Sequence, residues 1–320
     1  MKQWLAILPL LWSTALHAAL PEKQEHEFRT WTSTDGRTLR AELLEFSDQQ
    51  VKVKREKDMT IFEIPLENLA PADRKLVLGM VRERNRNNGL TQGSFASLIT
   101  GQFSPGKSKD GLNFQLFGSP EWDGTKRYPL VVWLHGAGQS GKDNTSQLAG
   151  HPKQWFVREA QENKPCFGLA PQCFDRDVGW KGQPAEDVVA LIKNLEDELP
   201  IDEARIYLTG SSMGGSGVWY MLAQWPEMFA CGIPLCGVGD PKTAGILRTI
   251  PIWAFHGDKD DQVPIERSRV MVEAIKALNG KVLLTELAGE GHLITSTVYD
   301  KQPLAEWMFL QRKSSATPAP

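Results

Sequence analysis

Residues 205–225 read Arg-Ile-Tyr-Leu-Thr-Gly-Ser-Ser-Met-Gly-Gly-Ser-Gly-Val-Trp-Tyr-Met-Leu-Ala-Gln-Trp, and this stretch decides the fold. Its apolar start predicts a strand, its end predicts a helix from Gly214 onward, and a Gly-x-Ser-x-Gly run centred on Ser212 joins the two. Glycines at these positions permit a tight turn that lifts a serine hydroxyl above a sheet. Ser212 is therefore a candidate nucleophile, and the alternative is a serine that merely caps the helix.

Apolar strands and helical stretches alternate on both sides of this turn. The expected strands cover residues 128–134, 166–170, 205–209, 232–235, 251–255 and 281–287. The expected helices cover residues 184–199, 214–225, 265–278 and 303–311. Because strands that are apolar throughout are buried on both faces, the pattern predicts an α/β fold with a mostly parallel central sheet and helices on both faces.

A serine is a poor nucleophile until a base takes its proton, so the six histidines of the chain are the candidates for that base. His292 follows the last expected strand on a Gly-rich loop, and in this kind of fold the histidine comes last in chain order. His135 and His256 come directly after apolar strands and are expected to support the walls of the site. We therefore expect His292 to be the base, the alternative being an ordinary surface histidine.

The acid that orients this histidine is expected between Ser212 and His292 in the chain. Three carboxylates compete for the role after the fifth expected strand, namely Asp258, Asp260 and Asp261. Spacing alone does not choose among them.

The negative charge that develops on a carbonyl oxygen during acyl transfer needs two backbone N–H donors. One donor is expected at Met213, directly after the candidate nucleophile, and the other at Gly136 or Ala137, in the loop after the first expected strand. The alternative for that loop is an ordinary Gly-rich turn. The chain has no His-Glu-x-x-His and no Cys-x-x-Cys run, so neither a metal nor another cofactor is expected.

Several stretches, among them Tyr128-Pro-Leu-Val-Val-Trp-Leu-His-Gly-Ala-Gly and Trp253-Ala-Phe-His-Gly-Asp-Lys-Asp-Asp-Gln-Val-Pro, resemble those of one group of α/β-hydrolases. This is the exported group of predicted peptidases and carboxylesterases, which is related to feruloyl and acetyl-xylan esterases and to polyhydroxybutyrate depolymerases. The resemblance covers roughly residues 95–312 and implies an α/β-hydrolase fold. Similar hydrolases carry the acid four residues before the proline of an Asp-x-x-Val-Pro run, which favours Asp260 here.

The chain departs from this group at two places that flank the expected pocket and bear on the choice of substrate. Gly138-Gln139-Ser140-Gly141 stands where the group often has an acidic and a basic residue, and Leu293-Ile294 follows the histidine where an asparagine and a nearby tryptophan are usual. Gln139 is a candidate residue of the substrate cleft. Trp180 and Trp219 are also candidates, with packing in the core as an equal alternative.

The segment between the fourth and fifth expected strands is short. About a dozen residues separate Gly237 from Pro251, and an ordinary crossover already needs that many. This spacing leaves no room for the large lid that many α/β-hydrolases carry there. An uncovered site suits bulky or polymer-attached esters better than a sealed lipid pocket does.

Residues 1–19 have the pattern of a secretory signal peptide, with Lys2, an apolar run from Trp4 to Leu16 and small residues at the end. The alternative, a membrane anchor, needs about 20 apolar residues, whereas this run is shorter and contains Pro9. We therefore expect export to the periplasm or the extracellular space, without a membrane span. Export permits disulfides, yet buried free thiols are the expected state of the four cysteines.

A smaller β-rich module precedes the hydrolase. It resembles the SHD1-type, SH3-like module over the stretch from Arg29-Thr-Trp-Thr to Leu69-Ala-Pro-Ala-Asp-Arg, and Asp35-Gly36 marks a hairpin within it. We find no catalytic set there, and the expected role of the module is to bind a protein or a polymer. The expected organisation is a signal peptide at 1–19, the module at 22–80, a linker at 81–93, the catalytic domain at 94–313 and a disordered tail at 314–320.

The composition excludes other classes of partner. The 320 residues include 36 Lys and Arg against 39 Asp and Glu, a formal net charge of −3 without a basic stripe, so nucleic acid is not an expected partner. We expect a serine carboxylesterase-type hydrolase whose substrates include polysaccharide-linked acetyl or feruloyl esters. The alternatives are a serine peptidase of the prolyl-oligopeptidase type, a polyhydroxybutyrate-type depolymerase or a non-catalytic binding protein.

Overall fold

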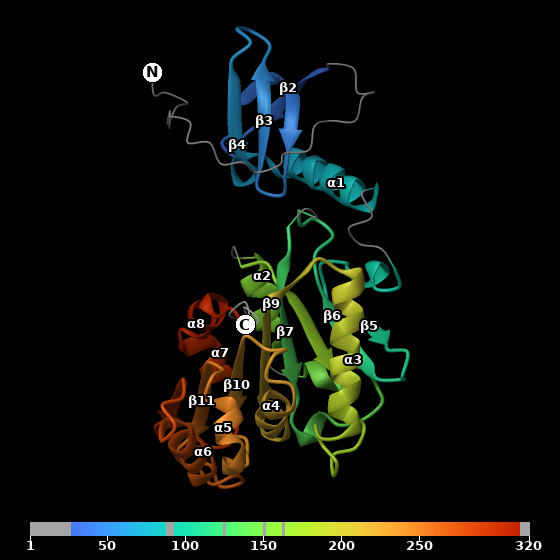
Figure 1. Cartoon of the computed structure of the whole chain (residues 1–320). Helices are drawn as coiled ribbons and strands as arrows, with labels where there is room; N and C mark the ends of the chain where they lie inside the picture. Colours follow the sequence, from blue (N-terminus) through green and yellow to red (C-terminus); the bar gives the residue numbers. More distant parts are fainter. Residues whose placement is uncertain (1–26, 88–92, 124–125, 150–151, 162–163, 314–320) are drawn as a thin grey trace, which may run out of the picture. The chain divides into compact units, whose positions relative to one another are not determined.

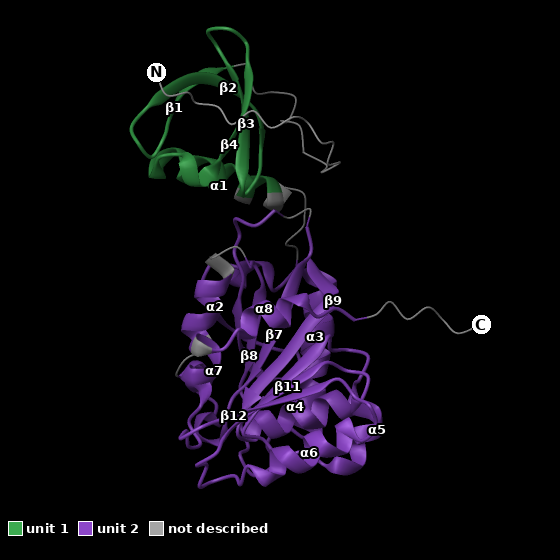
Figure 2. Cartoon of the chain, turned by 90° about the vertical axis from the view of Figure 1, so that its left-hand side faces the viewer, with its two compact units in different colours: residues 1–84 green, residues 85–320 purple. Residues whose placement is uncertain are grey.

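The computed structural model describes residues 27–87, 93–123, 126–149, 152–161 and 164–313. The chain divides into two compact units, residues 1–84 and residues 85–320 (Figure 2). The expected signal peptide and the expected tail lie outside the described residues. Within the described ranges, every helix is too short or too polar to span a bilayer.

The first unit is a four-stranded antiparallel sheet with one helix (Figure 1). In chain order and sheet order, its strands are β1 (Phe28–Thr32), β2 (Thr38–Phe46), β3 (Gln50–Arg55) and β4 (Ile61–Pro65), followed by α1 (Pro71–Asn87). Val51 and Val53 are buried while Lys52 and Lys54 remain partly exposed, as the alternation along a half-exposed strand predicts. The expected linker at 81–93 needs correction at its start, because residues 81–87 are helical.

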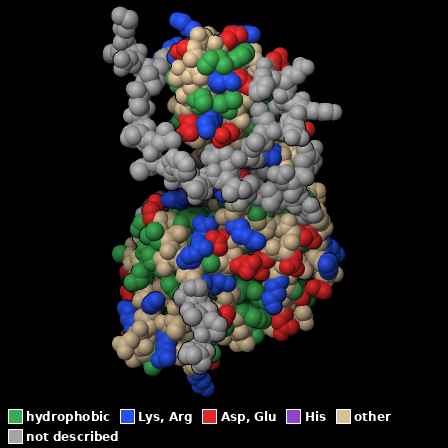
Figure 3. All heavy atoms as spheres, turned by 45° about the horizontal axis from the view of Figure 1, so that its top comes forward, with side chains coloured by type: hydrophobic (Ala, Val, Ile, Leu, Met, Phe, Trp, Pro, Cys, Tyr) green, Lys and Arg blue, Asp and Glu red, His purple; other side chains and the backbone are tan. Residues whose placement is uncertain are grey.

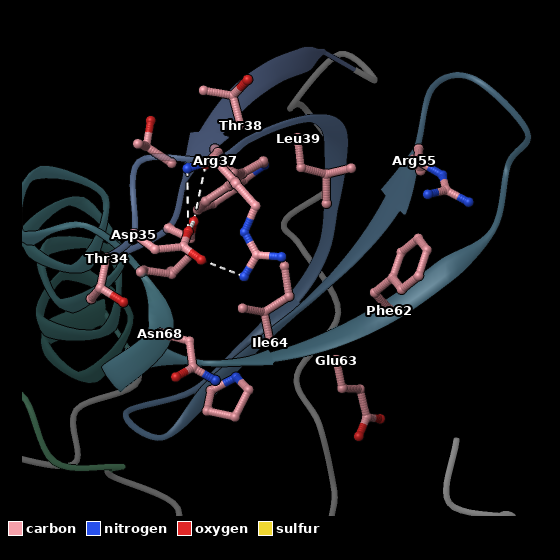
Figure 4. A pocket seen from close by; sticks show the side chains of 15 residues that line it. Thr34, Asp35, Arg37, Thr38, Leu39, Arg55, Phe62, Glu63, Ile64 and Asn68 are labelled. Atoms are coloured by element: carbon pink, nitrogen blue, oxygen red, sulfur yellow. Dashed lines mark hydrogen bonds and ion pairs between the residues drawn. The ribbon is translucent and has the colours of Figure 1, made fainter. Parts of the chain in front are cut away.

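The first unit carries a pocket of about 690 Å³ (Figure 4). Its charged side chains pair with near neighbours: Arg37 forms an ion pair with Asp35, and Arg55 forms one with Asp58 in the adjoining turn. The Arg55 guanidinium also lies 4.7 Å from the centre of the Phe62 ring. This wall offers hydrogen-bonding groups beside apolar surface, and we assign no reaction to it.

The second unit is built on an eight-stranded sheet (Figure 1). Its strands are β5 (Ser104–Lys107), β6 (Asn113–Phe117), β7 (Tyr128–Leu134), β8 (Phe167–Pro171), β9 (Ile201–Ser211), β10 (Cys231–Leu235), β11 (Ile252–Gly257) and β12 (Val282–Leu287). The sheet order is β12-β11-β10-β9-β7-β8-β6-β5, and the strands from β12 to β8 in this order pair in parallel. Every expected strand is present. Sequence analysis missed β5 and β6, which add to one edge in antiparallel fashion; a Pro105-Gly106 pair within β5 breaks the usual strand pattern.

Helices cover both faces of this sheet. They are α2 (Pro152–Gln161), α3 (Gln183–Glu198), α4 (Met213–Gln224), α5 (Ala244–Leu247), α6 (Glu266–Lys276), α7 (Thr295–Lys301) and α8 (Leu304–Leu310). Alternate residues of β7 belong to different cores: Leu130 and Val132 pack in a cluster with residues of α3, α4 and α6, whereas Val131 and Trp133 pack with residues of α2, α7 and α8. The predicted mostly parallel sheet with helices on both faces is therefore confirmed.

The connection from β10 to β11, which is described throughout, contains a 3₁₀ turn at Pro241–Thr243 and the single-turn helix α5. This length agrees with the expectation that no large lid is inserted between the two strands. The four cysteines are buried and free, as expected, and burial raises the pKa of the Cys166 and Cys231 thiols.

Charges of both signs mix on the surface of the second unit. On the face shown in Figure 3, Lys and Arg side chains lie among Asp and Glu side chains without forming a basic stripe. This face therefore presents no polyanion-binding track of the kind that nucleic acids require.

Candidate active site

Ser212 occupies the turn between β9 and α4 in a strained conformation, with φ +58° and ψ −116°. A Cβ atom at Gly214 would lie 1.9 Å from the Leu134 carbonyl oxygen, and one at Gly210 would lie 2.7 Å from the same oxygen. Only glycine can therefore occupy these two positions while β7 and the turn pack this closely. The close packing explains why the Gly-x-Ser-x-Gly run appears at this point in the sequence.

The hydroxyl of Ser212 does not cap the helix that follows. It makes no capping hydrogen bond to α4, and its Oγ lies 2.8 Å from Nε2 of His292. The predicted nucleophile and the predicted base therefore meet, although 80 positions separate them in the chain. The structure favours the nucleophile over the helix-cap alternative.

Asp260 lies on the other side of the His292 ring. The Nδ1–H of His292 donates to Oδ2 of Asp260 at 2.7 Å, which leaves Nε2 free to accept the hydroxyl proton of Ser212. Oδ1 of Asp260 accepts the backbone N–H groups of Gln262 and Val263 at 2.9 and 2.8 Å. Both carboxylate oxygens are therefore held, and the carboxylate is directed at the imidazole.

The two competing carboxylates lie elsewhere. Asp258 is exposed and accepts the backbone N–H of Gly289 at 2.7 Å, so it braces the loop that leads to His292. Asp261 is exposed. Of the three candidates, the structure brings Asp260 to the histidine, in line with the choice made from the resemblance.

Hydrogen bonds set the proton affinities of this pair. Interaction with the Cys236 sulfur and with the Asp260 carboxylate raises the pKa of His292 to about 9, against the opposing effect of burial. Burial tends to raise the pKa of Asp260, but the hydrogen bonds from Val263, His292 and Gln262 outweigh it and lower that pKa. The pair is thus a carboxylate next to an imidazole that is ready to carry positive charge.

A second histidine, His256, braces the Asp260 carboxylate from behind. Its Nε2–H donates to the Val263 carbonyl at 2.9 Å and lies 3.2 Å from Oδ2 of Asp260, while its Nδ1 accepts the hydroxyl of Ser268 at 2.7 Å. The His256 ring is fully buried. The expectation that this histidine supports the site agrees with these contacts.

His135 holds the loop that was expected to supply an oxyanion donor. Its Nε2 accepts the backbone N–H of Cys173 at 2.9 Å, so the proton sits on Nδ1 and is donated to the Gly136 carbonyl at 2.7 Å. Burial lowers the pKa of His135 to about 4, which keeps the ring neutral. Because a trans peptide points its C=O and N–H in opposite directions, fixing the Gly136 carbonyl also fixes the Ala137 N–H.

The two expected oxyanion donors lie close to the serine. Met213 begins α4 directly after Ser212, and the first N–H groups of a helix have no partner within it. A Cβ atom on Gly136 would lie 3.6 Å from the Cβ of Ser212. The Gly136-Ala137 loop therefore lies beside the nucleophile, and these donors remain a prediction that catalysis must test.

A pocket of about 570 Å³ opens over this arrangement. Its wall contains the predicted Ser212, His292, Gly136, Ala137 and Gln139. Leu293, which was expected to flank the pocket, also belongs to the wall. Sequence analysis missed other residues of the wall, among them Trp133, Gln147, Arg176, Gln262, Thr295 and Ser296. Proximity to His292 in the chain could have found the last two, whereas Arg176 comes from a loop after β8 with no signal of its own.

The two tryptophans proposed for the cleft need correction. Trp180 and Trp219 are 1% and 2% exposed and belong to the core cluster that contains residues of α3, α4 and α6, outside the pocket wall. Trp180 Nε1 donates to the His135 carbonyl at 3.0 Å, which ties it to the oxyanion loop from the inside. The core-packing alternative is therefore the right one for both.

One cluster offers metal-binding atoms. Cys236, Asp260 and His292 each present a ligand atom, and these atoms lie within 4.8 Å of one another. Asp260 already bonds to His292, and His292 also bonds to Ser212, so a metal there would compete with the hydrogen bonds described above. The expectation that no metal is needed stays a prediction.

The sequence model of the prolyl oligopeptidase family matches residues 176–253. The chain is 26% identical over 162 residues to a probable feruloyl esterase C of Aspergillus flavus, a match that covers 50% of this chain and 58% of the relative. It is 32% identical over 141 residues to a bifunctional acetylxylan esterase/xylanase of Neocallimastix patriciarum, covering 42% of this chain and 19% of the relative. The chain thus spans little more than half the length of the Aspergillus protein.

Solved structures confirm the fold. A thermostable esterase is 37% identical with a TM-score of 0.61, over 66% of this chain and 62% of that one. A putative dipeptidyl aminopeptidase IV from Bacteroides ovatus is 14% identical with a TM-score of 0.52, over 89% of this chain and 43% of that one, and shows the fold alone. The second unit has the predicted α/β-hydrolase fold, and the esterase supports the prediction of a serine carboxylesterase-type enzyme.

Proposed function

We propose that the chain is an exported serine hydrolase that cleaves carboxylic esters through an acyl-enzyme intermediate. The observation that carries the proposal is the continuous line of hydrogen bonds from Ser212 through His292 to Asp260, at the wall of an open pocket. A nucleophile within reach of a base, which a third group orients, is the arrangement that acyl transfer requires.

In the first half-reaction, Ser212 Oγ attacks the ester carbonyl while Nε2 of His292 takes the hydroxyl proton. The imidazolium that forms is stabilised by the Asp260 carboxylate 2.7 Å from Nδ1. His292 then gives its proton to the alcohol oxygen as the bond from carbon to that oxygen breaks. The alcohol leaves, and the acyl group stays on Ser212.

The carbonyl oxygen carries negative charge at each tetrahedral stage. The N–H groups of Met213 and of Gly136 or Ala137 are proposed to bind it. In the second half-reaction, His292 takes a proton from water, the hydroxide attacks the acyl carbon, and the proton passes to Ser212 Oγ as the acid leaves. Water is consumed once per turnover, and the enzyme returns to its starting state.

The proposed substrates are polysaccharide-linked acetyl or feruloyl esters. The curated relatives named above are a feruloyl esterase and an acetylxylan esterase, although each is only partly covered. Leu293 is 86% exposed on the pocket wall next to the base, where it offers apolar surface to an acyl or aryl group. The short connection from β10 to β11 leaves the site open to a bulky substrate.

A second candidate function is a serine peptidase. The match to the prolyl oligopeptidase family favours it and covers the segment that contains Ser212. The same three residues could cleave an amide, but the poorer leaving group then needs a proton from His292 at an earlier stage. A polyester depolymerase is a further alternative, because the chain is also 29% identical over 114 residues to a poly(3-hydroxyalkanoate) depolymerase C of Paucimonas lemoignei.

The decisive experiment is a substrate panel on the full chain and on Ser212→Ala. We expect the wild type to hydrolyse p-nitrophenyl acetate and to release acid from acetylated xylan or feruloylated sugars faster than it cleaves peptides. Ser212→Ala should lose at least about 1000-fold of kcat. Ser97→Ala, an exposed serine outside the pocket, is the matched control. Equal hydrolysis by the wild type and Ser212→Ala, or none by either, would refute the proposal and favour a binding protein.

Export and the role of the first unit belong to the same proposal. The N-terminal pattern supports cleavage near Ala19, which mass spectrometry of the protein recovered from outside the cytoplasm would measure. We propose that the SH3-like first unit binds a protein or a polymer. Co-sedimentation of the full chain with insoluble xylan, compared with the variant Arg37→Ala in the pocket of Figure 4, tests a polymer as the partner.

A further inference from the structure

Arg176 stands out on the wall of the pocket that contains Ser212. Among the described residues of that wall, it is the only one apart from His292 with a side chain that carries charge at neutral pH. It is exposed and, within the described part of the chain, forms no ion pair. A guanidinium on the wall of a reaction pocket without a carboxylate partner is available to a ligand.

The acidic groups nearest to Arg176 in sequence are engaged elsewhere or lie off the wall. Oδ1 of Asp175 accepts the backbone N–H groups of Asp177 and Val178 at 2.9 and 3.3 Å, which commits it to a local turn. Asp177 is exposed and does not belong to the pocket wall. Neither carboxylate forms an ion pair with the guanidinium of Arg176.

Asp143, an acidic residue outside the pocket wall, is also held by hydrogen bonds. The carboxylate of Asp143 accepts hydrogen bonds from Thr145 and Ser146, and Gln172 Nε2 donates to it at 3.1 Å. The remaining polar side chains of the wall, such as Gln139, are uncharged. The pocket consequently presents one unpaired positive charge to whatever enters it.

We infer that this pocket selects esters that carry a carboxylate, and that Arg176 is the residue that recognises it. The inference rests on the proposed esterase function and names the substrate class more closely. A planar guanidinium with five N–H donors matches a carboxylate in a two-pronged hydrogen bond, which a neutral ester substituent cannot form. The carboxylate can belong to the acyl group or to the sugar that bears the ester, for example a uronic acid.

Two pairs of substrates separate these sources. On the acyl side, p-nitrophenyl hemiglutarate is compared with p-nitrophenyl pentanoate, which has the same chain length without the charge. On the alcohol side, acetate release from acetylated polygalacturonate is compared with release from acetylated xylan. Each pair is measured as a ratio of kcat/KM, or of initial rates for the polymers, at low and at high salt, with the full chain.

For at least one pair, we expect the wild type to prefer the charged substrate by about fivefold or more at low salt, since an exposed charge pair is worth a modest factor. Arg176→Gln should bring that ratio to about one, and Arg176→Lys should retain part of the preference. High salt should shrink the wild-type ratio because the guanidinium is exposed. Arg248→Gln removes an exposed arginine outside the pocket and should leave the ratio as it is.

A wild type without preference for the charged member of either pair, or a preference that survives Arg176→Gln, would overturn the inference while leaving the esterase function intact. If no ester is cleaved, the proposed function fails, and binding then tests Arg176 by itself. Calorimetry on Ser212→Ala, with and without Arg176→Gln, needs no turnover; it compares monomethyl glutarate with the uncharged methyl pentanoate, and galacturonate with the uncharged galactose. Equal binding within both pairs by Ser212→Ala would also overturn the inference.

Discussion

Nε2 of His256 lies 3.2 Å from Oδ2 of Asp260, the same oxygen that accepts Nδ1–H of His292 at 2.7 Å. One carboxylate oxygen thus lies between two imidazoles that come from different strand ends. The His256 ring cannot turn, because Ser268 and the Val263 carbonyl hold its two nitrogens. His256 therefore acts through Asp260 as a positioning residue.

Replacing His256 should weaken catalysis without removing a reacting group. We expect His256→Phe to lower kcat by about tenfold with a smaller change in KM, since the Asp260 carboxylate loses its support. His256→Gln, which keeps a donor near the position of Nε2, should recover part of the loss. An unchanged kcat in His256→Phe, in protein shown by circular dichroism to be folded, would contradict the positioning role.

The pH dependence of kcat/KM should report His292. The base must be neutral to accept a proton, and the pKa of His292 is raised to about 9. The value of kcat/KM should therefore rise about tenfold per pH unit below that pKa and level off above it. With a histidine of ordinary pKa, the plateau would begin at a lower pH. Initial rates from pH 6 to about pH 10 measure this limb, and a plateau from pH 7 upward would show the pKa to be ordinary.

The Cys236 sulfur contributes to that raised pKa, so its removal should move the limb. In Cys236→Ala the pKa of His292 should fall, and the rising limb should shift toward lower pH. Cys231→Ala is the control: it removes a buried thiol at the start of β10, the strand that precedes Cys236, and no described contact joins this thiol to His292. If the rising limb stays at the same pH in Cys236→Ala, the raised pKa of His292 is due to Asp260 alone.

The turn that carries Ser212 should not tolerate a methyl group. Gly214→Ala would bring Cβ to 1.9 Å from the Leu134 carbonyl oxygen, and we expect a loss of at least about 3 kcal/mol in the free energy of unfolding. Gly245→Ala, where a Cβ meets nothing within 4 Å in α5, should be neutral or stabilising. Urea unfolding measures both, and equal stability of the two variants would refute the packing argument.

His135 contacts the loop that is predicted to supply an oxyanion donor. Its replacement should therefore weaken binding of the transition state and leave binding of the substrate nearly unchanged. His135→Phe keeps a ring but removes one of two hydrogen bonds to the Gly136 carbonyl, which the Gln139 N–H also donates to at 3.1 Å, so the Ala137 N–H is aimed less firmly. We expect kcat to fall by about 100-fold with KM nearly unchanged, because a misplaced oxyanion donor costs transition-state binding. A rise in KM at constant kcat would instead place His135 in substrate binding.

Two of the three predicted catalytic residues, Ser212 and His292, could be chosen from the sequence pattern alone. The turn at Ser212 could be predicted because a strand, a strained turn and a helix each leave a local pattern in the sequence. His292 followed from chain order and from a Gly-rich loop. Asp260 needed the resemblance, since no local rule separates three aspartates within four positions. In the fold, the hydrogen bond from His292 distinguishes Asp260 from the other two.

Other features could not be predicted because they depend on which parts of the chain face each other after folding. Trp180 and Trp219 were candidates for the cleft, but whether an aromatic ring faces a pocket or a core depends on neighbours far away in the chain. The helix α1 continues through residues that are polar and asparagine-rich, because its Val81 packs on the first sheet. Strand β6 is held by pairing with β8, and the edge strand β5 by pairing with β6, which no local signal encodes.

The sequence by itself determined the layers of the second unit, the strained turn and the residues that are predicted as nucleophile and base, since each is indicated by periodicity, by glycines or by chain order. Only the tertiary structure decided which carboxylate meets the base, which amides surround the serine and that Arg176 shares its pocket. These relationships join strand ends that lie far apart in the chain. A parallel sheet brings such ends together at one edge, and no local pattern reports the distance between them.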